Sequence, residues 1–195
     1  MRILVSLSLL LAGMLLAATA TQAVPIAFVA ELNGPSENPP NASPGTGFAT
    51  VTIDTVAHTM GVDVTFSGLL GNVTASHIHC CTDPPGNIGV ATPVPTFPGF
   101  PSGVTAGTYS QTFDLTLTTS YNPTFFNANG GTPASAEAAL VAGIEAGRAY
   151  LNIHTSQFGG GEIRGFLRPV PEPTTMLLLG SGLLSLVGFR RKFMR

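Results

Sequence analysis

Short runs in which apolar and polar residues alternate are the strongest constraint on how this chain can fold. Apolar residues occupy every second position from Ala49 to Asp54, and the segment from Val62 to Phe66 repeats the pattern. A period of two is typical of a β-strand with one buried face. Clusters of Gly, Pro and Asn separate such runs, so the chain is predicted to be mainly β.

The remaining patterns predict further strands and one helix. Thr132 suits the N-cap of that helix, Pro133 its first position and Gly147 the position after its end. With one short helix and sequential strands pairing, the simplest closed core is a Greek-key immunoglobulin-like β-sandwich. The further predicted strands are 26–32, 73–79, 109–117, 148–154 and 162–168.

The N-terminal segment, residues 1–23, is interpreted as a signal peptide. It combines the basic residue Arg2 with an apolar run over 3–16, and small residues precede a cleavage point after Ala23. Signal peptidase is therefore an expected partner. The alternative is an uncleaved anchor, which the shortness of the apolar run disfavours.

The C-terminal segment, residues 170–195, has three parts. The motif Val170-Pro171-Glu172-Pro173 comes first, an uncharged stretch over 174–189 follows, and a basic tail over 190–195 closes the chain. At a rise of about 1.5 Å per residue the stretch spans about 24 Å as a helix, a marginal membrane crossing. The basic tail would stay in the cytoplasm, which places the domain outside.

The segment between the two ends, residues 24–169, is predicted to be one domain. Nine acidic side chains against three arginines and no lysine give it a net charge of −6 with neutral histidines. Nucleic-acid binding requires a basic surface, so the composition argues against a nucleic-acid partner.

Three histidines are candidate metal ligands. His77 and His79 project from the same face of a predicted strand, and His154 is added if its own strand is a neighbour. Two or three imidazoles on one face could hold a copper or zinc ion. The alternative is structural, with the imidazoles bonding to loop carbonyls at the edge of a sheet.

Cys80 and Cys81 are the only cysteines, and they are adjacent. An exported protein meets an oxidising environment, so free thiols are not expected there. A vicinal disulfide between the two, an intermolecular link and metal coordination beside the histidines all remain open, with the vicinal disulfide preferred.

The segment Gly160-Gly161-Glu162-Ile163-Arg164-Gly165 is interpreted as structural. Its glycines suit a hairpin turn, and Glu162 and Arg164 share one face of a strand, where they could pair with each other or with neighbours. A surface ion pair of this kind contributes about 0–1 kcal/mol.

Taken in order, several short motifs resemble the CHRD domain, named after the repeated domain of chordin. The resemblance runs from about Ile26 to Arg168 and implies an extracellular β-sandwich. In chordin, such domains belong to a secreted protein that binds growth factors. The motifs are Phe28 to Leu32, Glu37-Asn38-Pro39-Pro40, Gly45-Thr46-Gly47, His77-Ile78-His79, Tyr150 to Thr155 and Gly160 to Gly165.

The C-terminal unit resembles the PEP-CTERM sorting signal of Gram-negative bacteria. That resemblance implies an exosortase as a partner, cleavage near Pro171-Glu172-Pro173 and transient anchoring in the inner membrane. The predicted location is therefore the cell surface or the extracellular matrix.

The predicted function is that of an exported binding or structural module whose ligand is a protein or a polysaccharide. No Gly-x-Ser-x-Gly, phosphate-loop or His-Glu-x-x-His motif occurs, so an enzyme is not expected. The alternative is a copper- or zinc-binding domain, in its extreme form an oxidoreductase. His77-Ile78-His79 is similar to the copper ligands of copper–zinc superoxide dismutase, but four histidines are too few for both of that enzyme's sites.

Overall fold

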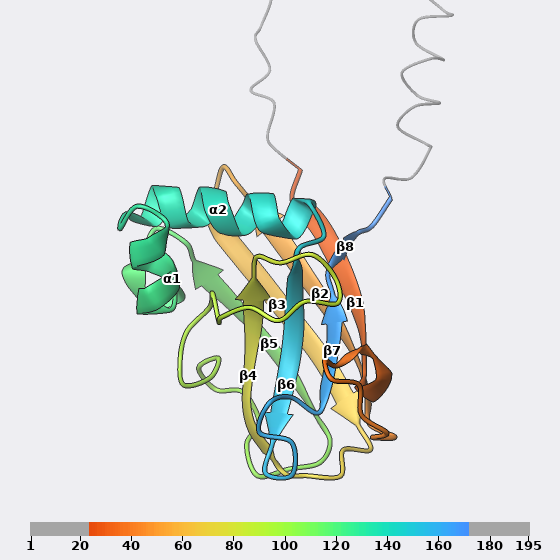
Figure 1. Cartoon of the computed structure of the whole chain (residues 1–195). Coiled ribbons are helices and arrows are strands. Elements are labelled where there is room, and N and C mark those ends of the chain that lie inside the picture. The colour runs from red at the N-terminus through yellow and green to blue at the C-terminus, as the bar shows by residue number, and fades with distance from the viewer. Residues whose placement is uncertain (1–23, 172–195) are drawn as a thin grey trace, which may run out of the picture.

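The computed structural model describes residues 24–171, and within them the prediction of a mainly β chain is confirmed (Figure 1). The predicted signal peptide with its cleavage point at Ala23 lies outside this range. So do Glu172 and Pro173 of the sorting motif, the predicted transmembrane helix 174–189 and the basic tail. Among the described residues, no helix has the length and apolar character needed to cross a membrane.

Antiparallel hydrogen bonds connect the strands into one curled sheet with the order β4-β6-β7-β1-β2-β3-β5, and β8 pairs with β1. Its strands are β1 (Ile26–Asn33), β2 (Thr46–Asp54), β3 (Thr59–Ser67), β4 (Val73–Cys80), β5 (Gly107–Asp114), β6 (Ala149–Thr155), β7 (Ile163–Phe166) and β8 (Arg168–Pro169).

The prediction of a Greek-key immunoglobulin-like sandwich is not confirmed, because the strands form a continuous sheet. The connection that makes it continuous is short: β7 meets β1 through the pair Asn33 and Arg164. The C-terminal segment predicted as one strand is divided into β7 and β8, so that β8 can pair with the beginning of β1.

Two α-helices occur among the described residues where one was predicted. α2 (Pro133–Glu145) has the predicted capping by Thr132, whose side chain accepts from the backbone N–H of Ser135. Gly147 follows its C-cap with a φ of +66°, which glycine adopts without strain. α1 (Pro123–Ala128) was missed, because a six-residue helix shows little periodicity. Two single-turn 3-10 helices, η1 (Gly34–Ser36) and η2 (Thr118–Ser120), complete the structure.

The apolar core lies between the concave face of the sheet and α2, which crosses one end of the strands (Figure 1). Alternation in β2 and β3 places one face of each strand in this core, as the sequence predicts. The fully buried side chains at its centre include Phe28, Val51, Ile53, Met60, Val62, Ile78, Leu140, Ile144, Leu151 and Ile153.

The free edge of β4 is covered by the long proline-rich loop that follows it. The backbone N–H groups of Ala91 and Phe97 donate to the carbonyls of Ile78 and Ser76, and Val90 forms a bridge with His79. Unpaired strand edges tend to associate with other chains, so this loop protects the edge. It also brings its own carbonyl groups beside the histidines of β4.

Candidate metal site

Strand pairing between β4 and β6 assembles the three histidines named by the sequence. Ala75 pairs with His154 and His77 with Asn152, so the three imidazoles extend from one face of two neighbouring strands. One nitrogen from each of His77, His79 and His154 lies within 4.8 Å of the others. β6 is thus the neighbouring strand that His154 needs in order to lie beside His77 and His79.

Each imidazole is held by a hydrogen bond to a backbone carbonyl. Nε2 of His77 donates to Pro95 at 2.7 Å, and Nδ1 of His79 donates to Ile88 at 2.8 Å. Nδ1 of His154 donates to Gly159 at 3.0 Å. A carbonyl only accepts, so the bonded nitrogen carries the hydrogen and the other nitrogen of a neutral ring keeps a lone pair.

The remaining nitrogen atoms are buried and have no hydrogen-bond partner: Nδ1 of His77, Nε2 of His79 and Nε2 of His154. Buried polar atoms are normally paired, so three neighbouring exceptions call for a ligand or an ordered molecule. A histidine bound to a metal typically donates its second nitrogen to a carbonyl or carboxylate, which is the arrangement of all three rings here. Around one ion with bonds of about 2.0–2.1 Å the nitrogens would lie about 3.3 Å apart. Binding therefore requires the rings to move together from their present separations of up to 4.8 Å.

The surroundings keep these rings neutral. Burial lowers the pKa of both His77 and His79 to about 4, although the hydrogen bonds to the carbonyls of Pro95 and Ile88 act in the opposite direction. Burial also lowers the pKa of His154. Metal ligands must be unprotonated, and at neutral pH these three already are.

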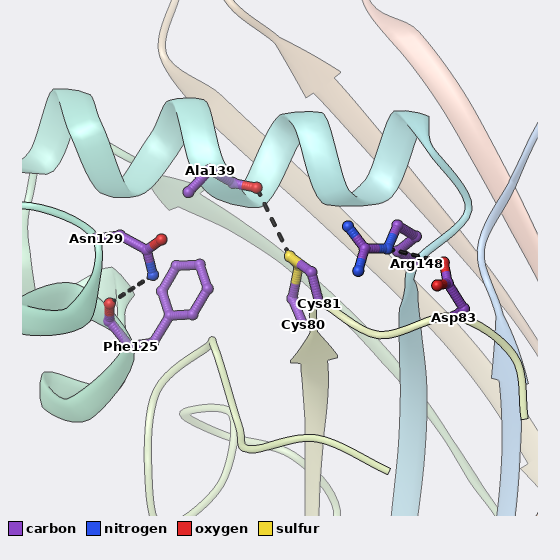
Figure 2. Close-up of a disulfide and its surroundings, with 7 residues drawn as sticks. All are labelled: Cys80, Cys81, Asp83, Phe125, Asn129, Ala139 and Arg148. Atoms are coloured by element: carbon purple, nitrogen blue, oxygen red, sulfur yellow. Dashed lines mark hydrogen bonds and ion pairs between the residues drawn. A yellow bond between two sulfur atoms is a disulfide. The ribbon is translucent and has the colours of Figure 1, made fainter. Parts of the chain in front are cut away.

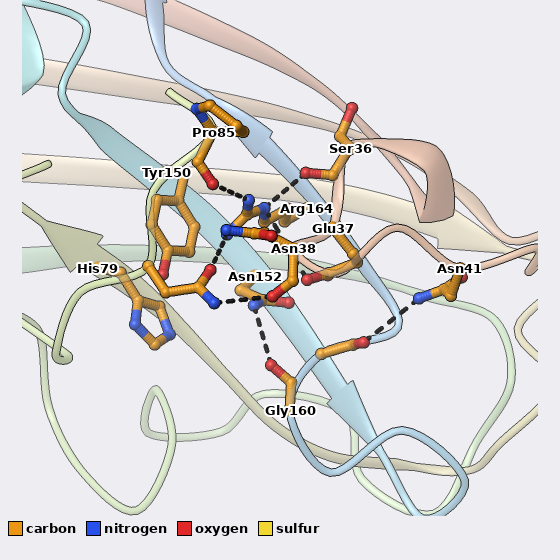
Figure 3. Close-up of polar contacts among 12 residues, drawn as sticks. Ser36, Glu37, Asn38, Asn41, His79, Pro85, Tyr150, Asn152, Gly160 and Arg164 are labelled. Carbon is orange, nitrogen blue, oxygen red and sulfur yellow. Dashed lines mark hydrogen bonds and ion pairs between the residues drawn. The ribbon is translucent and has the colours of Figure 1, made fainter. Parts of the chain in front are cut away.

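Aromatic and cationic side chains form one wall of the site. The ring of Tyr150 stacks on that of His79, and the guanidinium carbon of Arg164 lies 4.7 Å from the centre of the Tyr150 ring (Figure 3). The Tyr150 hydroxyl lies 3.3 Å from the backbone nitrogen of Ile88, in the loop that also binds His79. This wall fixes the plane of the His79 ring.

Arg164 itself is fully buried and ties two loops to β7. Its Nε donates to the carbonyl of Ser36 at 2.6 Å, and its terminal nitrogens donate to Pro85 and to the side chain of Asn87. Its carboxylate neighbour is Glu37, at 3.9 Å. Of the two predicted alternatives, Arg164 has the pairing with a neighbour and not with Glu162, and the prediction of a surface position is wrong because Arg164 is buried. Sequence alternation placed it on the right face but could not show the loops that cover it.

Glu162, the other half of that predicted pair, has its own buried network. Its carboxylate accepts from the hydroxyls of Ser43 and Thr155 at 2.6 and 2.7 Å, and from the backbone N–H groups of Leu70 and Gly71. Burial alone would raise the pKa of Glu162, but these four hydrogen bonds lower it overall. The carboxylate therefore connects the loop before β7 to the end of β6 and to the two loops that carry Ser43 and Leu70.

A second pair of unpartnered atoms lies beside Arg164. Oε1 of Glu37 and Oδ1 of Asn152 are buried without a hydrogen-bond partner. A Cβ at position 161 would lie 2.8 Å from Oε1 of Glu37 and 2.5 Å from Oδ1 of Asn152. Any side chain at position 161 would meet them. The importance of Glu37 was not visible in the sequence, since it lies in an irregular loop with no periodic pattern.

Cys80 and Cys81 form a disulfide at the end of β4, beneath α2 (Figure 2). Cys80 is buried, and Sγ of Cys81 lies 3.8 Å from the carbonyl oxygen of Ala139. Gly143 faces both sulfur atoms and has no room for a side chain. Of the three arrangements that the sequence left open, the structure has the vicinal disulfide, so the sulfurs are not joined to the histidine cluster.

The fold and the histidine cluster together describe a mainly β domain with a buried, carbonyl-supported group of three imidazoles. The chain belongs to the CHRD domain family, whose model matches residues 28–167. A second family model, the PEP-CTERM protein-sorting motif, matches residues 169–192. No curated protein and no solved structure matches the chain. Both resemblances noted in the sequence are thereby confirmed.

Proposed function

We propose that this protein is a CHRD module, displayed outside the cell, that binds one copper or zinc ion through His77, His79 and His154. The observation that carries the proposal is the cluster of three rings, each of which has one nitrogen within 4.8 Å of the others. In each ring one nitrogen bonds to a backbone carbonyl and the other is buried without a partner. A purely structural role predicts the hydrogen bonds to the carbonyls, but it does not predict three neighbouring rings that each bury a nitrogen without a partner.

Display outside the cell follows from the sorting motif. The PEP-CTERM match implies export and processing by an exosortase. Signal peptidase would cleave after Ala23, the segment 174–189 would hold the chain transiently in the inner membrane, and the exosortase would cut near Pro171-Glu172-Pro173. The module would then act at the cell surface or in the matrix, with a protein or polysaccharide as its further ligand.

Binding without turnover is the activity that these residues support. The three histidines supply ligands, and among the described residues no carboxylate or thiol joins them in the cluster. Acid–base or nucleophilic catalysis would need such a group in reach of a substrate. We therefore propose a metal-binding module.

Metal analysis of the purified protein tests the proposal. The wild type is expected to bind one equivalent of copper or zinc, and the variant His77→Ala/His79→Ala is expected to bind none. The matched control is His58→Asn, because His58 is the remaining histidine and pairs with Glu137 on α2 instead. Equal metal content in the double variant, or none in the wild type, would contradict the proposal, provided that circular dichroism shows folded protein.

A further inference from the structure

The three imidazoles form a ligand set without charge. Within residues 24–171, no carboxylate or thiolate joins His77, His79 and His154 in the cluster. Sites that contain Asp, Glu or Cys offset part of the charge of their ion, whereas an ion held here would keep all of it. The cost of moving an ion out of water rises steeply with its charge, so this environment penalises divalent ions more than monovalent ones.

A permanent cation adds to this penalty. Arg164 is 1% exposed and stacks on Tyr150, whose ring in turn stacks on His79 with 4.8 Å between the ring centres. Since β6 lies between β4 and β7 in the sheet, Tyr150 separates the guanidinium from the histidines. Arginine stays charged at every accessible pH, and each additional unit of metal charge is repelled by it.

Glu37 offsets this cation incompletely. Its carboxylate lies 3.9 Å from Nε of Arg164, yet burial raises the pKa of Glu37 to about 7. The carboxyl group is therefore only partly ionised near neutral pH. Together, Arg164 and Glu37 therefore contribute a net charge that is neutral to positive.

We infer that the histidine cluster selects monovalent copper, Cu(I), over Cu(II) and Zn(II). The inference rests on the proposed function, because it concerns the same three ligands. Imidazole suits both copper and zinc, so the type of ligand does not decide between them and the charge does. The number of ligands points the same way: Cu(I) accepts three, whereas Cu(II) favours tetragonal and Zn(II) tetrahedral surroundings with at least a fourth ligand.

Competition titrations on the purified protein test this selection. Cu(I) is supplied without oxygen in the presence of ascorbate and competed with bathocuproine disulfonate, Cu(II) is competed with nitrilotriacetate, and Zn(II) with a chromogenic zinc indicator. The dissociation constant is expected to be at least tenfold lower for Cu(I) than for either divalent ion. Each tenfold preference over Cu(II) raises the reduction potential of the bound couple by 59 mV relative to the free ions, which voltammetry measures independently.

A matched pair of variants isolates the effect of charge. His154→Asp replaces one neutral ligand by an anionic one, and His154→Asn has nearly the same size without the charge. The ratio of Cu(II) to Cu(I) affinity is expected to be at least tenfold higher in His154→Asp than in His154→Asn. Circular dichroism establishes that both variants are folded.

Several outcomes would overturn the inference. It fails if the wild type binds Cu(II) or Zn(II) through the three histidines as tightly as Cu(I), or if the two His154 variants show the same ratio. Those results leave the proposed metal site intact. A wild type that binds none of the three ions, or binding that survives in His77→Ala/His79→Ala, overturns the proposed function as well, so the two failures are distinguishable.

Discussion

The ring of Tyr150 lies parallel to that of His79, within 5°, with 4.8 Å between the ring centres. The two residues are directly paired across β4 and β6, so this stack follows from the strand register. Through this stack Tyr150, which is not one of the proposed metal ligands, orients the ring of His79, which is. Residues behind metal ligands commonly matter to affinity in this way.

Replacing Tyr150 by leucine is therefore expected to weaken metal binding. The loss should be about 10-fold to 100-fold, the range typical of residues that support metal ligands. Tyr150→Phe keeps the stacked ring and should bind within about threefold of the wild type. Competition titration measures both variants, and an equal loss in the two would assign the effect to the hydroxyl near Ile88 instead of to the ring.

Glu162 is expected to be a major contributor to stability. In the wild type, both oxygens of the Glu162 carboxylate accept hydrogen bonds. Glu162→Gln keeps the shape of the side chain but replaces one oxygen by an NH2 group, which cannot accept, so buried donors lose their partner. The expected loss in the free energy of unfolding is about 2–4 kcal/mol, measured by urea denaturation. Glu31→Gln, at an exposed position of β1, serves as the control and should change it by less than about 0.5 kcal/mol.

Glu37 should make the domain less stable as the pH rises from about 4.5 to about 7. Burial raises its pKa in the folded state to about 7 from an ordinary value of 4.5, so in this interval the folded chain binds more protons than the unfolded chain. The stability that Glu37 contributes is thus fully present below pH 4.5, the pKa of the unfolded state. It decreases as the pH rises to about 7, the pKa of the folded state, by at most about 1.4 kcal/mol per pH unit. Glu37→Gln should remove this slope from a series of urea denaturations, and an unchanged slope would show that Glu37 is not its source.

Gly143 should not tolerate a side chain, although it lies within α2. Alanine is the better helix former by about 1 kcal/mol, yet its Cβ would collide with both sulfurs of the Cys80–Cys81 disulfide. Gly143→Ala is expected to lower the free energy of unfolding by about 1–3 kcal/mol, because overpacking outweighs propensity. Ala142→Gly, at an exposed neighbouring position, measures the propensity alone. A more stable Gly143→Ala protein would mean that α2 can shift away from the disulfide at little cost.

The sequence by itself determined the local features of this protein. Alternation in 49–54 and 62–66 identified strands and their buried faces, Thr132 and Gly147 marked the ends of α2, and the spacing of His77 and His79 placed both rings on one side. Each of these depends on the geometry of a few consecutive residues. For the same reason the short helix α1 escaped notice.

Only the tertiary structure decided which distant segments meet. It put β4 beside β6, and so brought His154 to the other two histidines, and it placed the carbonyls of Ile88 and Pro95 behind their rings. It also joined the strands in one sheet and directed Arg164 to loops far away in the chain. Such pairings depend on the combined packing of the whole core, and the period of a strand shows which face is buried but not which neighbour covers it.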